Sequence, residues 1–307
     1  MSLAILCSGQ GAQHAAMLDM IADHSAATAI IKAGEAELGF RLREVLALPE
    51  TIYRNAIAQP LICLTQLALW TALRQDAPRP AAFCGYSIGE LGAYACADAL
   101  DAVGLARITA ARAALMDQAA AATPGGMLAV QGLRRVEVNK LCAGRRAWVA
   151  IAIGEEEFVI GGEQAALDTL STTFAERGAK PARLKVGLAS HTPLLSGAVE
   201  PFRALLDASS LCAPAIPVVA GIDAAWVVRR EAAIDKLSLQ LDTAVAWSDC
   251  LDTLYERGCR VFLELGPGRA LSRMMQARFA DVDARPVDDF RSLDGVSSWL
   301  SRHTARF

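Results

Sequence analysis

The chain has 307 residues, and 53% of them are hydrophobic, so it can bury a large core in one domain or in a large domain with an insertion. Its formal net charge of −3 argues against nucleic-acid binding, because a surface that follows phosphates needs a clustered basic excess. With four histidines and no Cys-x-x-Cys pair, little is left to build a metal site, so we expect chemistry without a metal.

The first segments of the chain predict neither an export signal nor a membrane span. Met1 is followed at once by a strand-like run at residues 3–7, with no basic region before it and no small-residue cleavage site after it. The longest apolar stretch, residues 61–73, is interrupted by Thr65 and Gln66 and is shorter than the roughly 20 residues needed to cross a bilayer. Most of the eight cysteines lie among apolar residues, which favours buried thiols in a reducing compartment. We therefore expect a cytoplasmic protein.

Short apolar runs alternate with longer helical patterns along the chain, which is typical of an α/β fold with a largely parallel sheet. Three of these runs, at residues 3–7, 81–84 and 261–265, are each followed by a loop that contains glycine. The loops begin with Gly9-Gln10-Gly11, with Gly85 and with Gly266-Pro267-Gly268. Ligands of such sheets bind beyond the carboxyl ends of the strands, so we expect the three loops to meet at one crevice.

The second of these loops contains a Gly-x-Ser-x-Gly motif, Gly85-Tyr86-Ser87-Ile88-Gly89, between a strand-like run and a helical segment at residues 90–97. A sharp turn from strand to helix exposes the serine hydroxyl, and the backbone N–H groups at the helix N-terminus can stabilise an oxyanion. The same motif occurs by chance in plain turns. Its position after a strand and before a helix favours Ser87 as a nucleophile.

Arg112 is a charged residue on an otherwise apolar helix face, four residues after Ile108 and in line with Leu105, Leu115 and Met116. A guanidinium in that position needs a partner, because an unpaired buried charge costs on the order of several kcal/mol. Two interpretations stay open. Arg112 forms a structural salt bridge, or it binds the carboxylate of a substrate through two parallel hydrogen bonds.

Residues 125–186 have the order strand, helix, strand, strand, helix, strand. The six segments are 127–131, 134–142, 147–153, 157–161, 164–177 and 182–186. This is the order of a ferredoxin-like unit. We therefore predict a small ferredoxin-like domain at residues 125–186, inserted into a large domain that comprises residues 1–124 and 187–307.

His191 is the best-placed base among the four histidines, because Ser190-His191-Thr192-Pro193 lies in a polar break between a strand-like run and a helix. Two of the others fall in early helices, and His303 falls in a polar tail. A lone loop histidine is more often structural than catalytic. The presence of a candidate nucleophile, Ser87, favours the catalytic role.

The sequence resembles the malonyl-CoA:acyl carrier protein transacylase family in several motifs that occur in family order between about residues 3 and 275. These are Gly9-Gln10-Gly11-Ala12-Gln13, Gly85-Tyr86-Ser87-Ile88-Gly89-Glu90, Arg112, Ser190-His191, Gln240 before Trp247, and Leu265-Gly266-Pro267-Gly268. The resemblance implies a hydrolase-like large domain with a ferredoxin-like insertion. It also implies an enzyme that moves a malonyl group from malonyl-CoA to the thiol of an acyl carrier protein and uses no cofactor.

The resemblance implies a role for each matching residue in the reaction. Ser87 is the nucleophile, His191 is its base, and the backbone carbonyl of Gln240 orients the imidazole. Gln10 and the backbone N–H of Ile88 form the oxyanion hole.

The substrate site implied by the resemblance contains Arg112, which binds the malonyl carboxylate, with Gln10, Tyr86 and Ser190 beside it. Tyr86 stands where the family usually has histidine. Ser190 stands where malonyl-selective polyketide extender transferases usually have phenylalanine, so it leaves more room. The sequence around Tyr86 is similar to the transacylase (epsilon) subunit of biotin-independent malonate decarboxylase. That similarity implies other decarboxylase subunits as partners, including a small carrier subunit with a modified dephospho-CoA arm.

Three alternative functions stay open from the sequence. The first is the malonyl transacylase of fatty-acid synthesis. The second is a serine acyl hydrolase or thioesterase that recruits Asp294, or His303 with Asp283 or Asp288, from the polar tail. The third is an inactive subunit that docks a carrier protein, for which Tyr86 is the only support.

Overall fold

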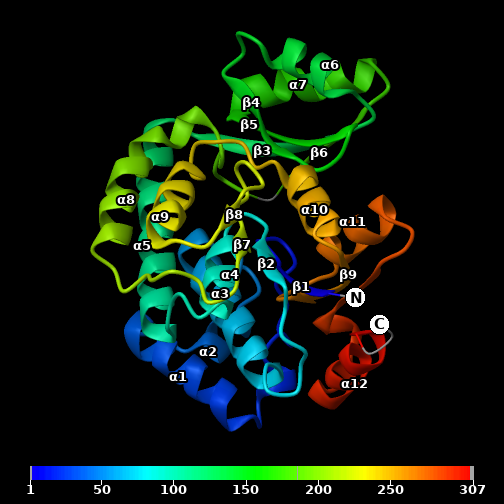
Figure 1. Cartoon of the computed structure of the whole chain (residues 1–307). Helices are drawn as coiled ribbons and strands as arrows, with labels where there is room; N and C mark the ends of the chain where they lie inside the picture. The colour runs from blue at the N-terminus through cyan, green and yellow to red at the C-terminus, as the bar shows by residue number, and fades with distance from the viewer. Residues whose placement is uncertain (1, 185, 305–307) are drawn as a thin grey trace.

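The computed structural model describes residues 2–184 and 186–304, which form a large α/β part and a smaller antiparallel sheet (Figure 1). The large part contains a six-stranded sheet in the order β10-β9-β1-β2-β7-β8. Its strands are β1 Ser2–Cys7, β2 Ala82–Gly85, β7 Val218–Val219, β8 Trp226–Val227, β9 Cys259–Leu265 and β10 Asp283–Pro286. Every pair of neighbours is parallel except β7 with β8, which confirms the predicted α/β fold with a mostly parallel sheet.

The side chains of the central strand β1 alternate between two apolar clusters, because successive residues of a strand point to opposite faces. Leu3, Ile5 and Cys7 belong to one cluster, and Ala4 and Leu6 belong to the other. The first cluster includes residues of α1 Ser25–Leu38, α2 Leu42–Leu46, α3 Asn55–Leu73, α4 Gly89–Cys96, α5 Ala102–Ala122, α8 Val199–Asp207, α9 Arg230–Leu239 and α12 Leu293–Thr304. The second includes residues of α10 Trp247–Glu256 and α11 Ala270–Arg278.

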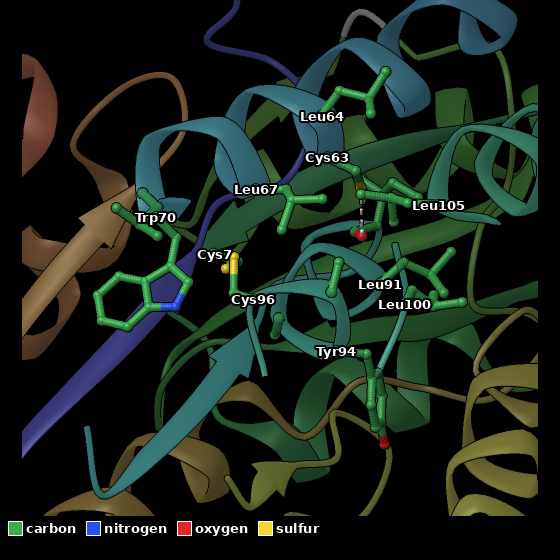
Figure 2. Packing of buried hydrophobic residues seen from close by; sticks show 14 of the residues in the cluster. Cys7, Cys63, Leu64, Leu67, Trp70, Leu91, Tyr94, Cys96, Leu100 and Leu105 are labelled. Atoms are coloured by element: carbon green, nitrogen blue, oxygen red, sulfur yellow. Dashed lines mark hydrogen bonds between the residues drawn. The ribbon is translucent and has the colours of Figure 1, made fainter. Parts of the chain in front are cut away.

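Most residues of helix α3 are buried within the first cluster. Figure 2 shows Cys63, Leu64, Leu67 and Trp70 of α3 within the cluster that also includes Cys7 of β1. Among residues 2–184 and 186–304, α3 is the one helix that is long and apolar enough to cross a bilayer by length and composition, and 83% of its apolar window is buried inside the protein. This degree of burial is typical of a helix in the core of a folded protein.

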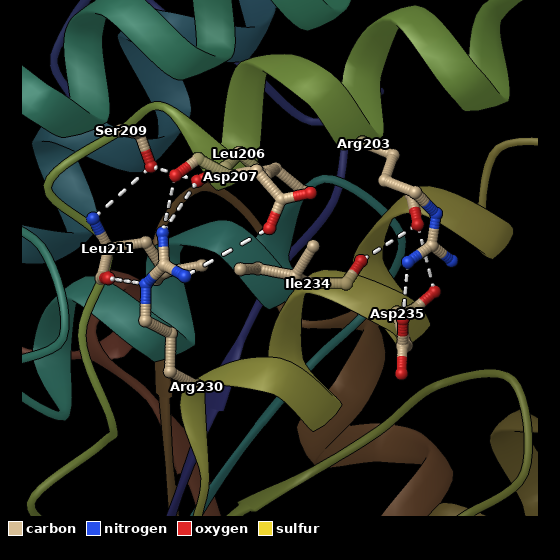
Figure 3. A network of polar contacts seen from close by, with 9 residues as sticks. Arg203, Leu206, Asp207, Ser209, Leu211, Arg230, Ile234 and Asp235 are labelled. Carbon is tan, nitrogen blue, oxygen red and sulfur yellow. Dashed lines mark hydrogen bonds and ion pairs between the residues drawn. The ribbon is translucent and has the colours of Figure 1, made fainter.

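Helices α8 and α9 are joined by a polar network (Figure 3). Arg203 on α8 forms an ion pair with Asp235 on α9. Arg230, at the start of α9, donates hydrogen bonds to the carbonyl oxygens of Leu206, Asp207 and Leu211, at and after the C-terminal end of α8. Cationic side chains suit this position, because the last carbonyls of a helix lack partners within the helix. The network therefore ties α9 to the C-terminal end of α8.

The smaller sheet has the order β4-β5-β3-β6, with every neighbouring pair antiparallel. Its elements are β3 Gly125–Gln131, α6 Arg135–Cys142, β4 Ala147–Ala152, β5 Glu157–Glu163, α7 Gln164–Glu176 and β6 Lys180–Arg183. Figure 1 shows α6 and α7 together on one side of this sheet. The element order is the one predicted for a ferredoxin-like unit. The last strand is earlier than the predicted 182–186, and residue 185 lies outside the described residues.

The smaller sheet is hydrogen-bonded to the large part at Val245. The backbone N–H of Val245 donates to the Ala150 carbonyl at 2.9 Å, and the Ala152 N–H donates to the Val245 carbonyl at 2.9 Å. These bonds form an isolated parallel bridge between β4 and the segment that follows α9. The same segment begins at Gln240, so the bridge ties the smaller sheet to a predicted site residue.

Candidate active site

Ser87 lies in a tight turn between β2 and α4. It adopts a φ of 56°, a left-handed conformation that residues other than glycine seldom take. A Cβ atom at Gly85 would lie 2.2 Å from the Glu90 nitrogen, and one at Gly89 would lie 2.2 Å from the Cys7 carbonyl oxygen. Both glycines are therefore required by the backbone packing, which explains the spacing of the Gly-x-Ser-x-Gly motif.

His191 is hydrogen-bonded to Ser87 at one ring nitrogen and to a backbone carbonyl at the other. Its Nε2 lies 2.7 Å from Ser87 Oγ, and its Nδ1 lies 2.6 Å from the carbonyl oxygen of Gln240. Because a carbonyl oxygen can only accept, the Nδ1 atom carries the proton and Nε2 is left to accept the serine hydroxyl. This is the arrangement of a nucleophile with an oriented base.

The electrostatic surroundings of His191 keep it neutral. The side chain is 2% exposed, and its burial lowers the pKa from 6.5 to about 4, helped by the positive charge of Arg112 and opposed by the hydrogen bond to Gln240. The imidazole is thus unprotonated near pH 7 and can accept a proton. His191 also has a left-handed φ of 62°, and its own N–H donates to the Leu241 carbonyl at 2.9 Å.

The three glycine-containing loops meet beyond the carboxyl ends of β1, β2 and β9, as predicted. The Ser8 N–H donates to the Leu265 carbonyl at 3.0 Å, and the Tyr86 N–H donates to the Cys7 carbonyl at 2.9 Å. A Cβ at Gly9 would lie 2.8 Å from the Tyr86 carbonyl oxygen. The first loop is therefore packed directly against the turn that carries the candidate nucleophile.

The residues predicted to form an oxyanion hole, Gln10 and Ile88, lie on two of these adjoining loops. Ile88 is the N-cap residue of α4, and in the described part of the chain its backbone N–H has no acceptor. Gln10 is half-buried in the loop after β1, next to Gly9. A free N–H at a helix N-terminus is suited to stabilise a negative oxygen. The part that Gln10 and Ile88 take in catalysis stays a prediction.

Arg112 is buried in α5, and its guanidinium contacts two side-chain amides. Its Nη1 donates to Gln59 Oε1 at 2.9 Å and its Nη2 donates to Gln240 Oε1 at 3.1 Å. The side chain is 2% exposed, and its burial lowers the pKa to about 10, so it remains a cation at neutral pH. No carboxylate among residues 2–184 and 186–304 lies within 4.0 Å of it. The structural salt bridge considered from the sequence is therefore not found in that part of the chain.

Tyr86 and Ser190 flank the Ser87–His191 pair. Tyr86 packs edge-on against Trp247 with ring centroids 5.1 Å apart, and burial raises the pKa of its hydroxyl. The backbone of Ser190 lies against β5, because a Cβ at Gly161 would come within 3.3 Å of the Ser190 carbonyl oxygen. The loop that carries His191 is thus packed on the smaller sheet.

Two side chains at the site received no role from sequence reasoning, Gln59 and Glu90. Gln59 is fully buried in the apolar helix α3. A polar amide in an otherwise aliphatic stretch of sequence was the signal that could have marked it as a site residue. Glu90 follows the serine motif, and its Oε2 accepts hydrogen bonds from Gln240 Nε2 at 2.5 Å and from Gly221 N–H at 2.9 Å. Both residues contact partners far away in the sequence.

The polar tail does not supply an alternative base for Ser87. His303 Nδ1 donates to the Trp299 carbonyl at 2.8 Å within α12, and its Nε2 lies 4.0 Å from Asp283. Asp288 instead contacts His14 and the Gly268 N–H. Within the described residues, no group of three or more His, Cys, Asp or Glu side chains is placed to hold a metal ion.

Comparison with known proteins gives consistent matches over nearly the whole chain. Residues 5–297 match the family described as the acyl transferase domain. The chain is 26% identical to the malonyl CoA-acyl carrier protein transacylase of Haemophilus influenzae, over 97% of this chain and 98% of that protein. It is 29% identical to the protein of the same name from Mycobacterium bovis, over 96% of this chain and 99% of that one.

Solved structures agree with the sequence matches. The structure of malonyl-CoA:acyl carrier protein transacylase from Xanthomonas oryzae pv. oryzae superposes with a TM-score of 0.91 at 30% identity, covering 98% of this chain and 99% of that one. A type II polyketide synthase acyl-carrier protein in complex with its malonyl-transacylase gives a TM-score of 0.92 at 25% identity, covering 97% of this chain and 99% of that one.

Proposed function

Because the chain belongs to the acyl transferase domain family, we propose that it moves a malonyl group from malonyl-CoA to the thiol of an acyl carrier protein through a malonyl-Ser87 intermediate. The single observation that carries this proposal is the hydrogen-bonded series from Ser87 Oγ to His191 to the Gln240 carbonyl. The similar proteins that are named malonyl transacylases, and the similar one found in complex with an acyl-carrier protein, support the choice of donor and acceptor.

In the first half of the reaction, His191 Nε2 takes the hydroxyl proton as Ser87 Oγ attacks the thioester carbonyl carbon. The oxygen of the tetrahedral intermediate becomes negative and lies against the Ile88 N–H and Gln10. When the intermediate collapses, the C–S bond breaks and the CoA sulfur leaves with the proton from His191. The malonyl group is then an ester of Ser87.

In the second half, His191 takes the proton of the carrier thiol, and the sulfur attacks the ester carbonyl. The bond between the acyl carbon and Ser87 Oγ breaks, and Oγ regains the proton from His191. Because the same base serves both halves, His191 must return to its neutral form between them. Its low pKa favours that return.

Arg112 accounts for the selection of an acyl group with a free carboxylate. Its guanidinium is buried, charged and held by neutral amides, so a malonyl carboxylate would be its first anionic partner within the site. A carboxylate there would also cancel the positive charge that lowers the pKa of His191, which makes the imidazole a stronger base when the substrate is bound. An acetyl group supplies neither effect.

For the acceptor, we propose the small carrier subunit of a biotin-independent malonate decarboxylase, because Tyr86 precedes the nucleophile as in the transacylase subunit of that system. The carrier of fatty-acid synthesis fits the relatives equally well. Transfer rates to the two carriers, measured side by side with the same malonyl-CoA, distinguish them. A preference for the fatty-acid carrier would remove the decarboxylase assignment and leave the malonyl transfer intact.

The malonyl-Ser87 intermediate gives a direct test of the proposed function. Brief exposure to malonyl-CoA should add one malonyl group to the peptide that contains Ser87, as measured by mass spectrometry of the whole protein and of its peptides. Ser87→Ala should abolish the adduct and reduce transfer by at least about 10⁴-fold, as loss of a nucleophile does in other acyl-enzyme systems. An adduct that persists in the variant, or one on a cysteine, would contradict the assignment.

A further inference from the structure

Gln240 contacts three groups of the site at once. Its backbone carbonyl accepts from His191 Nδ1, its side-chain Oε1 accepts from Arg112, and its side-chain Nε2 donates to Glu90. One residue therefore touches both the base and the cation proposed to hold the substrate. The position of Gln240 therefore affects both, through its side-chain amide for Arg112 and through its backbone carbonyl for His191.

Glu90 is the least accessible carboxylate near the site, with 1% of its surface exposed. It lies in the first turn of α4, three residues after Ser87. Its Oε2 accepts from Gly221 N–H and from Gln240 Nε2, whereas in the described part of the chain its Oε1 is buried without a hydrogen-bond partner. A buried carboxylate with one unsatisfied oxygen destabilises the fold, so its presence calls for another explanation than stability.

The charges of Glu90 and Arg112 fix the orientation of the Gln240 side-chain amide, with Nε2 toward Glu90 and Oε1 toward Arg112. An amide has a donor end and an acceptor end that are nearly equal in size, so it can fit a site in two orientations. An ionised carboxylate can only accept and a guanidinium can only donate. With Glu90 on one side and Arg112 on the other, only the orientation seen in the structure satisfies both.

We infer that Glu90 is a positioning residue for acyl transfer: through the Gln240 amide it holds Arg112 in the direction that selects a carboxylated acyl group, and it holds the residue whose carbonyl orients His191. This inference rests on the proposed malonyl transfer and adds a residue to it. Glu90 touches neither the acyl group nor the reacting atoms. Its effect is transmitted through two hydrogen bonds of Gln240.

The first test replaces the charge and keeps the shape. In Glu90→Gln, a second amide can donate or accept, so the Gln240 amide is no longer fixed. We expect kcat/KM for malonyl-CoA to fall by about 10- to 100-fold, in the range found for residues that orient a functional group from outside the reacting atoms. We expect a smaller loss for acetyl-CoA, because it does not use the guanidinium. The ratio of the two kcat/KM values is the measurement that decides.

The matched control is Glu264→Gln. Glu264 is also a fully buried glutamate, and its carboxylate accepts from the Leu271 and Ser272 N–H groups of α11, away from Gln240. The control should change the melting temperature without changing the malonyl-to-acetyl ratio. If Glu90→Gln gives the same pattern as the control, Glu90 is merely structural and the inference is wrong.

A second variant disturbs the contact between Glu90 and Gln240 without changing either residue. It provides a test if Glu90→Gln does not fold. A Cβ at Gly221 would lie 2.9 Å from Glu90 Oε2 and 3.5 Å from Gln240 Nε2, so Gly221→Ala displaces the carboxylate while the charge remains. We expect the malonyl-to-acetyl ratio to fall in the same direction, by a smaller factor. An unchanged ratio in a folded Gly221→Ala protein would count against the inference.

The dependence on pH gives a readout that a structural role would not change. The titratable and charged side chains around Glu90, from α4, α5, α10 and the loop after β7, are Tyr94, Arg112, Cys250 and Asp223. Burial raises the pKa of Glu90 to about 7, well above the pKa of about 4 for His191. As the pH falls through about 7, Glu90 gains a proton and ceases to be an acceptor only. The wild-type ratio should therefore fall on the acid side of pH 7, and Glu90→Gln should lack this inflection.

A double variant separates this inference from the proposed function. In an Arg112→Ala background, Glu90→Gln should change the malonyl-to-acetyl ratio by less than about two-fold, because the group through which it acts is gone. Full additivity of the two effects would overturn the inference. A wild-type protein that forms no malonyl-Ser87 adduct would instead overturn the proposed function, whatever the Glu90 variants do.

Discussion

The two sheets of the molecule bury very different kinds of side chain. In the smaller sheet and its helices, residues 125–183, all of which are described, every fully buried side chain in the core is apolar. The large part buries all of the polar and charged side chains that the described residues keep from solvent, among them Glu90, Arg112, His191 and Gln240. Buried polar groups reduce stability unless they are paired, and the four named here are hydrogen-bonded to one another or to Ser87 at the candidate site. We therefore expect substitutions at these four residues to change catalysis, and substitutions in the core of the smaller sheet to change mainly stability.

The largest effect that this comparison predicts is the loss of the base in the large part. His191→Ala should reduce malonyl transfer by about 10²- to 10⁴-fold, because in the described part of the chain Ser87 Oγ is hydrogen-bonded to no other group. Transfer is measured as the initial rate of loading of the carrier thiol. The control is His303→Ala on α12, which should stay within about two-fold of the wild type. The reverse ranking of the two variants would indicate a hydrolase-like site built from the polar tail.

The second effect concerns the cation of the large part. Arg112→Ala should lower kcat/KM for malonyl-CoA by about 10²-fold or more, consistent with the several kcal/mol found for broken buried charge pairs, while acetyl transfer stays level or rises. Arg112→Lys should restore only part of the loss, because an ammonium cannot form two parallel hydrogen bonds to a carboxylate. Thermal melts are recorded alongside. Equal losses for both acyl groups together with a large drop in melting temperature would remove Arg112 from the substrate site.

The smallest effect on catalysis is expected in the smaller sheet. Phe174 is fully buried in α7, so Phe174→Ala should lower the free energy of unfolding by about 3–5 kcal/mol, as large-to-small core substitutions do. The malonyl-to-acetyl ratio of the protein that remains folded should not change. Denaturant unfolding gives the first quantity and steady-state kinetics gives the second. A changed ratio would contradict the expectation that the core of the smaller sheet affects stability and not the choice of acyl group.

Sequence reasoning succeeded where a feature of the structure is determined by residues that are close together in the sequence. The strand-loop-helix pattern around Ser87 predicted a turn that the structure contains, because Gly85 and Gly89 are required within a few residues of the serine. It was less accurate at β6, which runs over Lys180–Arg183 and not over 182–186. That strand is an edge strand and contains Pro181, which an edge tolerates, so its residues show little of the apolar alternation that marks a strand.

The polar network of the site could not be predicted in the same way. Arg112 was noticed because a charge interrupts an apolar face, yet its partners, Gln59 and Gln240, are 53 and 128 residues away. The contact of Gln240 with Glu90 spans 150 residues. Such pairs depend on how α3, α4, α5 and the end of α9 are packed around the sheet. No periodicity within a single segment contains that information.

The backbone bridge at Val245 connects the smaller sheet to the segment whose Gln240 carbonyl accepts a hydrogen bond from His191. The bridge lies five residues after Gln240, and both of its hydrogen bonds go to β4. A rotation of the smaller sheet against the large part must either break these two bonds or pull on the segment that positions the carbonyl of Gln240. A displacement of β4 would therefore reach, through five residues of backbone, the carbonyl that is hydrogen-bonded to His191 Nδ1.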